Sequence, residues 1–331
     1  MSLRQISAAS HRLGRLALLS CAAAAIGIGA AGAAKADDKP LSIYFVGCAA
    51  PTGFHGYLAR GAAEAGKNLG VKVTYIYPDE LTIPNQVQKI EEAIAAKANG
   101  IALCEFAEDA AYVDVAKRAK EAGIAFGSAA APPAGAQVRD PNDIFLFRTG
   151  SDEKAAGALT GKRLAAMGIK GGVAVVDQQP GDATCRDRAD SEIAALKAAG
   201  IKAEFLESSM DPGQESEIVV NYLRKNPDTA AATSVCHISA GLLSAKADSG
   251  KTDLVITGYD LDAQALDAVK DGRQAFTIDQ QQFWRGYMPV LLLTHYLKYG
   301  LVEANYFLTG PTVVDKSNID QVAKLVLAGY R

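Results

Sequence analysis

The sequence predicts an α/β protein built on two parallel sheets, each with helices on both faces. Short apolar runs alternate with segments of helical periodicity along nearly the whole chain. The alternation pauses at an Ala-, Pro- and Gly-rich loop, Ala129 to Asn142, and then restarts. A chain of 331 residues can form two domains of ordinary size, and 49% apolar with 21% charged residues is typical of a soluble globular protein.

The elements before this loop follow one another as strand, helix, strand. The expected strands are Ser42–Gly47, Val71–Ile76, Ile101–Cys104 and Ile124–Gly127, and the expected helices are Phe54–Leu69, Pro84–Ala96 and Ala111–Ala122. Pro84 suits the first position of its helix, where a missing N–H costs nothing. Gly123 ends the third helix. This alternation predicts a parallel sheet.

The second half repeats the pattern. The expected strands are Ile144–Phe147, Gly172–Val176, Ala203–Leu206, Ala231–Val235, Leu254–Gly258, Ala275–Ile278 and Thr312–Val314, and the expected helices are Asp152–Met167, Arg186–Ala199, Gln214–Arg224, Ala240–Ala247, Leu261–Lys270, Phe283–Tyr299 and Ile319–Ala328.

Residues 1–36 have the pattern of a cleavable secretory signal peptide. Arg4, Arg12 and Arg15 precede a run rich in Ala and Gly, and Ala34-Lys35-Ala36 matches an A-x-A cleavage site. We therefore expect an exported, periplasmic protein. A membrane anchor is one alternative. The other is a lipoprotein with a lipidated Cys21, since Leu18-Leu19-Ser20-Cys21 resembles a lipobox.

Loss of this segment removes four basic and no acidic residues, which changes the net charge from −3 to −7. An acidic surface disfavours nucleic-acid binding, which needs basic patches. Cys48, Cys104, Cys185 and Cys236 remain, without C-x-x-C or zinc-finger spacing, so neither a metal nor another cofactor is expected.

Two neighbouring strands in the stretch from Val255 to Tyr287 end in polar residues. Asp260 follows the first, and Gln280 follows the second. Ligands of open parallel sheets bind beyond the carboxyl ends of the strands. The two side chains therefore predict a polar rim that can bind hydroxyl groups.

The same stretch, with its G-Y-D and D-Q strand ends, resembles periplasmic sugar-binding proteins of the ribose-binding type. The resemblance extends from about Ser42 to Leu327 and implies the type I periplasmic-binding-protein fold. In that fold, two doubly wound lobes are joined by a hinge of three crossovers, here near Gly150, Gln280 and Pro311. The implied lobes are 40–149 with 281–309 and 150–280 with 310–331.

The resemblance also implies ligand-binding residues at the strand ends and the helix starts. They are Cys48, Phe54, His55 and Glu105 in the first lobe and Arg186, Cys236, His237, Asp260 and Gln280 in the second. Phe54 would stack on a sugar, and Glu105 could accept hydrogen bonds from two hydroxyls. Arg188, by contrast, is expected to be structural, and Trp284 to pack within a lobe.

This chain departs from the family pattern at two strand ends. Ser128 to Ala131 lacks the usual charged pair, and Cys236-His237 replaces Asn-Asp. The usual pentose or hexose is therefore in question, and a smaller polyol or a ligand with its own charge would suit the cavity. Disulfides Cys48–Cys104 and Cys185–Cys236 are one hypothesis, and four buried thiols are the other.

The function implied by the resemblance is that of a monomeric substrate-binding protein. It would carry a sugar or polyol to the membrane permease of an ABC importer without chemical conversion. The alternatives are an exported α/β enzyme and a receptor for chemotaxis or signalling. For an enzyme, Cys104-Glu105 with His55 or His237 is a candidate nucleophile pair, but the chain has no G-x-S-x-G elbow and no P-loop.

Overall fold

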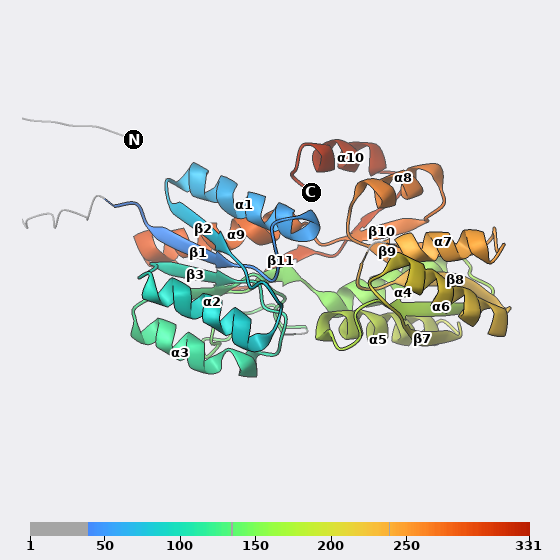
Figure 1. The fold of residues 1–331 in the computed structure, drawn as a ribbon, viewed down its shortest axis with the longest axis horizontal. Coiled ribbons are helices and arrows are strands. Elements are labelled where there is room, and N and C mark those ends of the chain that lie inside the picture. The colour runs from blue at the N-terminus through green and yellow to red at the C-terminus, as the bar shows by residue number, and fades with distance from the viewer. Residues whose placement is uncertain (1–38, 134, 238) are drawn as a thin grey trace, which may run out of the picture. The chain divides into compact units, whose positions relative to one another are not determined.

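The computed structural model describes residues 39–133, 135–237 and 239–331 (Figure 1). The expected signal peptide and Cys21 lie outside the described residues. None of the helices in the described part is long and apolar enough to span a membrane.

The first sheet has four parallel strands. Their order is β2 (Lys72–Ile76), β1 (Ser42–Val46), β3 (Gly100–Leu103) and β4 (Ala125–Ser128). Successive side chains of a strand point to opposite faces of its sheet. Accordingly, Ile43 and Phe45 of β1 belong to one core cluster, and Val46 belongs to the other.

Two pairs of helices cover this first sheet. One face carries α1 (Gly53–Leu69) and α9 (Gln282–Tyr299), and the other carries α2 (Ile83–Ala95) and α3 (Val113–Glu121), which the short η1 (Asp109–Ala111) precedes. Figure 1 shows α9, in orange, beside the blue α1 and β1 from the start of the chain. The last long helix, α9, therefore packs on the first sheet although it is distant from that sheet in the sequence.

The second sheet has six strands, and only its edge strand is antiparallel. The order is β12 (Thr312–Val314), β10 (Phe276–Asp279), β9 (Val255–Tyr259), β8 (Thr229–Ser234), β6 (Gly172–Asp177) and β7 (Ala203–Glu207). The helices that accompany it are α4 (Glu153–Ala166), α5 (Ala183–Ala198), α6 (Pro212–Lys225), α7 (Ala240–Asp248), α8 (Ala263–Asp271) and α10 (Ile319–Leu327). The α4–α5 pair packs on one face, and the α6–α7 pair packs on the other.

We call the first sheet with α1, α2, α3 and α9 the first lobe, and the second sheet with its helices the second lobe. Strands β5 (Thr149–Ser151) and β11 (Phe307–Gly310) pair with each other in a small separate sheet. The chain passes from the first lobe to the second through β5. It returns between β10 and α9, and it passes to the second lobe again between β11 and β12.

The expected strand Ile144–Phe147 is wrong. The structure has no strand there; the nearest begins at Thr149. The apolar side chains instead fill the core, since Phe145 packs in one cluster of the first lobe and Phe147 packs in the other. The apolar run at Ile144–Phe147 therefore reflects burial in the core and not a strand. Strand β11 was not predicted from the sequence.

Candidate ligand-binding cavity

A cavity of about 420 Å³ is lined by side chains from both lobes. It lies at the carboxyl ends of the parallel strands, where Cys48 follows β1, Glu105 follows β3 and Asp260 follows β9. A second hollow of about 410 Å³ shares Glu105, Phe106 and Thr184 with it. The volume of the first cavity is in the range of small-molecule sites.

Eight of the nine expected site residues line this cavity. They are Cys48, Phe54, His55, Glu105, Cys236, His237, Asp260 and Gln280. The structure places the ninth, Arg186, elsewhere.

Arg186 and Arg188 lie on different faces of α5, because two residues turn a helix by about 200°. Arg186 is exposed and forms an ion pair with Asp190 at 2.9 Å. Arg188 is buried at the cavity wall, where its Nε donates to Glu153 Oε2 at 2.6 Å and its Nη1 donates to the Val235 carbonyl at 2.9 Å. Arg188, which was expected to be structural, therefore lines the cavity while it forms a buried ion pair, and Arg186 does not line the cavity. The buried spacing of Cys185, Arg188 and Glu192 on this helix was the signal that could have separated them.

Asp260 has a strained backbone conformation and lies in the polar wall of the cavity. Its φ of 66° is in the left-handed region, which residues other than glycine seldom adopt, and such strain concentrates at functional sites. Gln280 Nε2 and Gln282 Nε2 both donate to Asp260 Oδ1, at 2.7 and 2.9 Å. Oδ2 accepts no hydrogen bond from any described residue, so it can accept one from a ligand. Burial raises the pKa of this carboxyl, and nearby Arg188 opposes that rise.

Glu105 is a buried acid on the opposite lobe. Burial raises its pKa to about 8, although Arg148 lies 3.7 Å from its Oε1 and Ser128 Oγ donates to that oxygen. Its Oε2 is buried and has no hydrogen-bond partner in the described part of the chain. At neutral pH the group is therefore mostly a neutral carboxylic acid, which can donate a hydrogen bond as well as accept one.

The first turn of α1 supplies an aromatic wall. The Phe54 and His55 rings are 5.1 Å apart in an edge-to-face arrangement, and the Arg285 guanidinium lies 5.6 Å from the centre of the Phe54 ring. Burial, aided by the charge of Arg285, lowers the pKa of His55 to about 4, so its ring is neutral. His55 Nδ1 is buried with no hydrogen-bond partner among the described residues.

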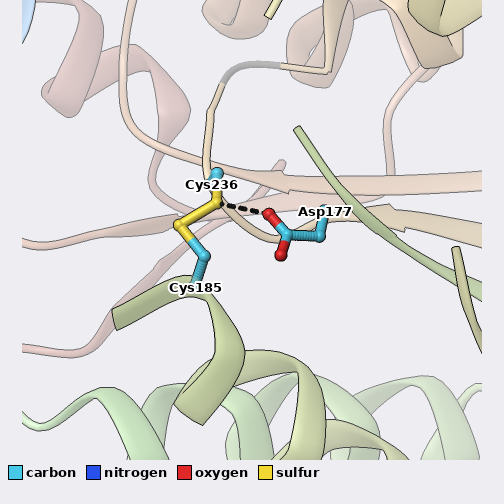
Figure 2. A group of neighbouring side chains, drawn as sticks. All are labelled: Asp177, Cys185 and Cys236. Atoms are coloured by element: carbon cyan, nitrogen blue, oxygen red, sulfur yellow. Dashed lines mark hydrogen bonds between the residues drawn. A yellow bond between two sulfur atoms is a disulfide. The ribbon is translucent and has the colours of Figure 1, made fainter. Parts of the chain in front are cut away.

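Two cysteine pairs line the cavity, and they differ in state. Cys185 and Cys236 form a disulfide with a Cα–Cα distance of 5.2 Å, which joins the start of α5 to the loop after β8 (Figure 2). Cys48 and Cys104 are free thiols with their sulfurs 3.4 Å apart. The disulfide hypothesis therefore holds in the second lobe only.

Asp177 lies beside the disulfide, with its Oδ1 3.0 Å from Cys236 Sγ (Figure 2). Metals bind thiolates, and a disulfide contains none. The three side chains thus do not form a metal site in this state.

Sequence reasoning missed several residues of the cavity wall. The most important is Arg285, which lies in the first turn of α9, five positions after Gln280. An arginine near the start of an otherwise apolar helix was the available signal. Trp284, its neighbour, stacks on Phe307 outside the cavity.

A protein-family model described as "Periplasmic binding protein domain" matches residues 43–301. A xylose/arabinose-binding protein of Sulfolobus acidocaldarius is 27% identical over 247 residues. That match covers 70% of this chain but only 60% of the relative, less than two thirds of its length.

Solved structures have the same fold. An ABC transporter solute-binding protein from Burkholderia graminis, in complex with D-arabinose, superposes with a TM-score of 0.73 at 24% identity and covers 86% of this chain and 98% of its own. A carbohydrate transporter from Acidothermus cellulolyticus, in complex with myo-inositol, has a TM-score of 0.74 at 25% identity and covers 88% and 100%. These likenesses confirm the expected α/β fold with two parallel-sheet lobes.

Proposed function

Since the chain belongs to the family of periplasmic binding protein domains, we propose that it captures a sugar or polyol and delivers it to the membrane permease of an ABC importer. The observation that carries this proposal is the cavity itself. It is lined from both lobes and presents hydrogen-bonding atoms that no described residue satisfies, among them Glu105 Oε2 and His55 Nδ1. The relatives support the ligand class, because one is named for xylose and arabinose and two solved structures hold D-arabinose and myo-inositol.

Each group in the cavity has a task in this proposal. Phe54 packs against the apolar face of the ligand, Asp260 and Gln280 bind hydroxyls from the second lobe, and the Glu105 acid binds one from the first. Further proposed contacts are Cys48, His55, Arg188, Cys236 and His237. Closing of the lobes removes water from these contacts and strengthens each of them. The ligand leaves unchanged.

We also propose the domain boundaries and the periplasmic location that the sequence predicts. The lobes comprise residues 40–149 with 281–309 and 150–280 with 310–331, and the three crossovers between them serve as a hinge. The protein acts as a monomer in the periplasm after residues 1–36 are removed.

A thermal-shift screen over pentoses, hexoses, tetritols, pentitols, inositols and sugar acids tests the proposal, and titration calorimetry then gives the affinities. Asp260→Asn should weaken binding of the ligand found by about 10- to 100-fold, because a hydrogen bond to a charged group contributes about 1.5–3 kcal/mol. Arg186→Ala is the matched control and should bind like the wild type, since Arg186 is exposed and paired with Asp190.

Three results would contradict this function. The first is no binding in the whole panel, the second is equal affinity of Asp260→Asn and the wild type, and the third is conversion of the bound solute. The third is checked by NMR of the solute recovered after incubation with the protein, and it would favour the enzyme alternative.

A further inference from the structure

Arg285 is a buried arginine in the cavity wall that forms no ion pair within the described part of the chain. Its relative exposure is 8%. The other two buried arginines have acidic partners, since Arg148 pairs with Asp109 and Asp143 and Arg188 pairs with Glu153. A buried charge without a counter-charge is costly. Arg285 therefore differs from both.

The hydrogen bonds of Arg285 go only to neutral acceptors. Its Nε donates to the Ala129 carbonyl, and its Nη1 lies 3.4 Å from Gln280 Oε1. Its Nη2 has no acceptor among the described residues. These contacts and the Phe54 ring hold the guanidinium in place, and they leave one edge of it for a ligand.

The acidic groups of the cavity wall interact with partners other than Arg285. Asp260 lies in the field of Arg188, and Glu105 is mostly protonated at neutral pH because burial raises its pKa to about 8. Asp182 caps α5 by accepting hydrogen bonds from two of its backbone N–H groups. None of these three carboxyl groups forms an ion pair with Arg285.

The start of α1 adds positive potential to the same wall. This helix of 17 residues has no capping side chain and no acidic residue in its first turn. Thr52, Gly53 and Phe54 at its start line the cavity with Arg285. Helix N-termini favour anions. The unpaired guanidinium and the uncapped helix start thus favour the same kind of ligand group.

We propose that the ligand is a small polyhydroxylated carboxylate, a sugar acid of the aldonic or uronic class, with its carboxylate on Arg285 and its hydroxyls on Asp260 and Gln280. This inference rests on the proposed function and narrows its ligand class. A guanidinium matches a carboxylate in a two-bond fork. A carboxylate ligand also accounts for the absence of the family's charged pair at Ser128 to Ala131, because the ligand then supplies a charge that these residues lack.

The test is calorimetry at pH 6 with matched pairs: D-galactose and D-galacturonate, L-arabinose and L-arabinonate. At this pH the sugar carboxylate is ionised. Glu105 and Cys104 are mostly neutral, because their pKa values are about 8 and about 7, the latter lowered by the hydrogen bond from Cys48. We expect at least one acid to bind about 10- to 100-fold more tightly than its neutral partner.

Arg285→Gln should remove this preference, measured as the ratio of the affinity for the acid to the affinity for its neutral partner, and Arg285→Lys should keep part of it. Arg186→Gln is the control for loss of one positive charge. Equal or tighter binding of every neutral sugar by the wild type overturns the inference but leaves the proposed function intact. If Arg285→Gln fails to fold, the comparison of each acid with its neutral partner on the wild-type protein still tests the inference. Tighter binding of D-glucose 6-phosphate than of any carboxylate overturns the assignment too.

Discussion

At the scale of single residues, the second lobe buries a carboxyl that nothing neutralises. Glu192 of α5 has no exposed surface, and neither of its oxygens has a hydrogen-bond partner among the described residues. Burial raises its pKa from the ordinary value of 4.5 to about 8. The native protein therefore keeps this proton at neutral pH, whereas the unfolded chain releases it.

Stability should respond to this difference. Between pH 4.5 and 8 the native state holds more protons than the unfolded state, so the free energy of unfolding falls as the pH rises, by up to about 1.4 kcal/mol per pH unit from this group. Glu192→Gln should remove that slope. The variant should be about as stable as the wild type at pH 5 and clearly more stable than the wild type at pH 8. Urea unfolding at pH 5 and at pH 8 measures the free energy of unfolding, and Glu121→Gln, at an exposed position, is the control. Parallel curves for Glu192→Gln and the wild type would contradict the prediction.

The cysteines give a second prediction at this scale. Mass spectrometry after alkylation of the denatured, unreduced protein should show labels at Cys48 and Cys104 and none at Cys185 and Cys236. After reduction all four should be labelled. Because the Cys48 and Cys104 sulfurs are 3.4 Å apart, the protein must be purified without an oxidant. Absence of label at the first pair in such a sample would mean that it, too, is a disulfide.

At the scale of elements, both lobes join a pair of helices through glycine. In the first lobe, a Cβ added to Gly61 of α1 would lie 2.1 Å from the Phe283 carbonyl oxygen, and one added to Gly286 of α9 would lie 2.0 Å from that of Leu58. In the second, a Cβ on Gly157 of α4 would lie 2.0 Å from the Arg188 carbonyl oxygen. The backbones therefore touch, and each contact lies near residues that line the cavity.

Gly286→Ala tests the first of these contacts. The added methyl group must push α1 and α9 apart, and overpacking of this kind typically costs about 1–3 kcal/mol. Because Phe54, His55 and Arg285 lie on these helices, ligand affinity should fall as well. Chemical denaturation and calorimetry measure the two effects. Gly213→Ala, at an exposed helix position, is the control, and equal effects of both substitutions would contradict close packing as the cause.

The elements also show what the sequence could predict. Asp260, Gln280 and Glu105 could be placed in the cavity because each follows a buried parallel strand, and such strands end at one edge of a sheet. Arg188 was not separated from Arg186, because an error of a residue or two in a helix start changes which face a side chain occupies, and only the spacing of Cys185, Arg188 and Glu192 along α5 distinguishes the two. Arg285 depends on how α9 packs against β3, β4 and α1, which are distant in sequence, and no local pattern reports that.

At the scale of the whole molecule, the proposed ligand would contact groups from both lobes, so its binding should stabilise both lobes together. A hundredfold excess over the dissociation constant adds about 2.7 kcal/mol. For large domains 1 kcal/mol raises Tm by about 2–4 °C, so the expected rise is about 5–10 °C. Differential scanning calorimetry measures it. A shift confined to one of two separate transitions would mean that only one lobe binds the ligand.

The position of α9 has a consequence for how the protein is made. Strands β1 to β4 leave the ribosome first, yet α9, which covers one of their faces together with α1, begins only at Gln282. At about 5–20 residues per second, the stretch from residue 129 to residue 281 takes on the order of 10 to 30 seconds to synthesise. Throughout that interval only α1 covers that apolar face of the early sheet. We therefore expect the nascent chain to need a holding chaperone, and its later half to mature before its earlier half.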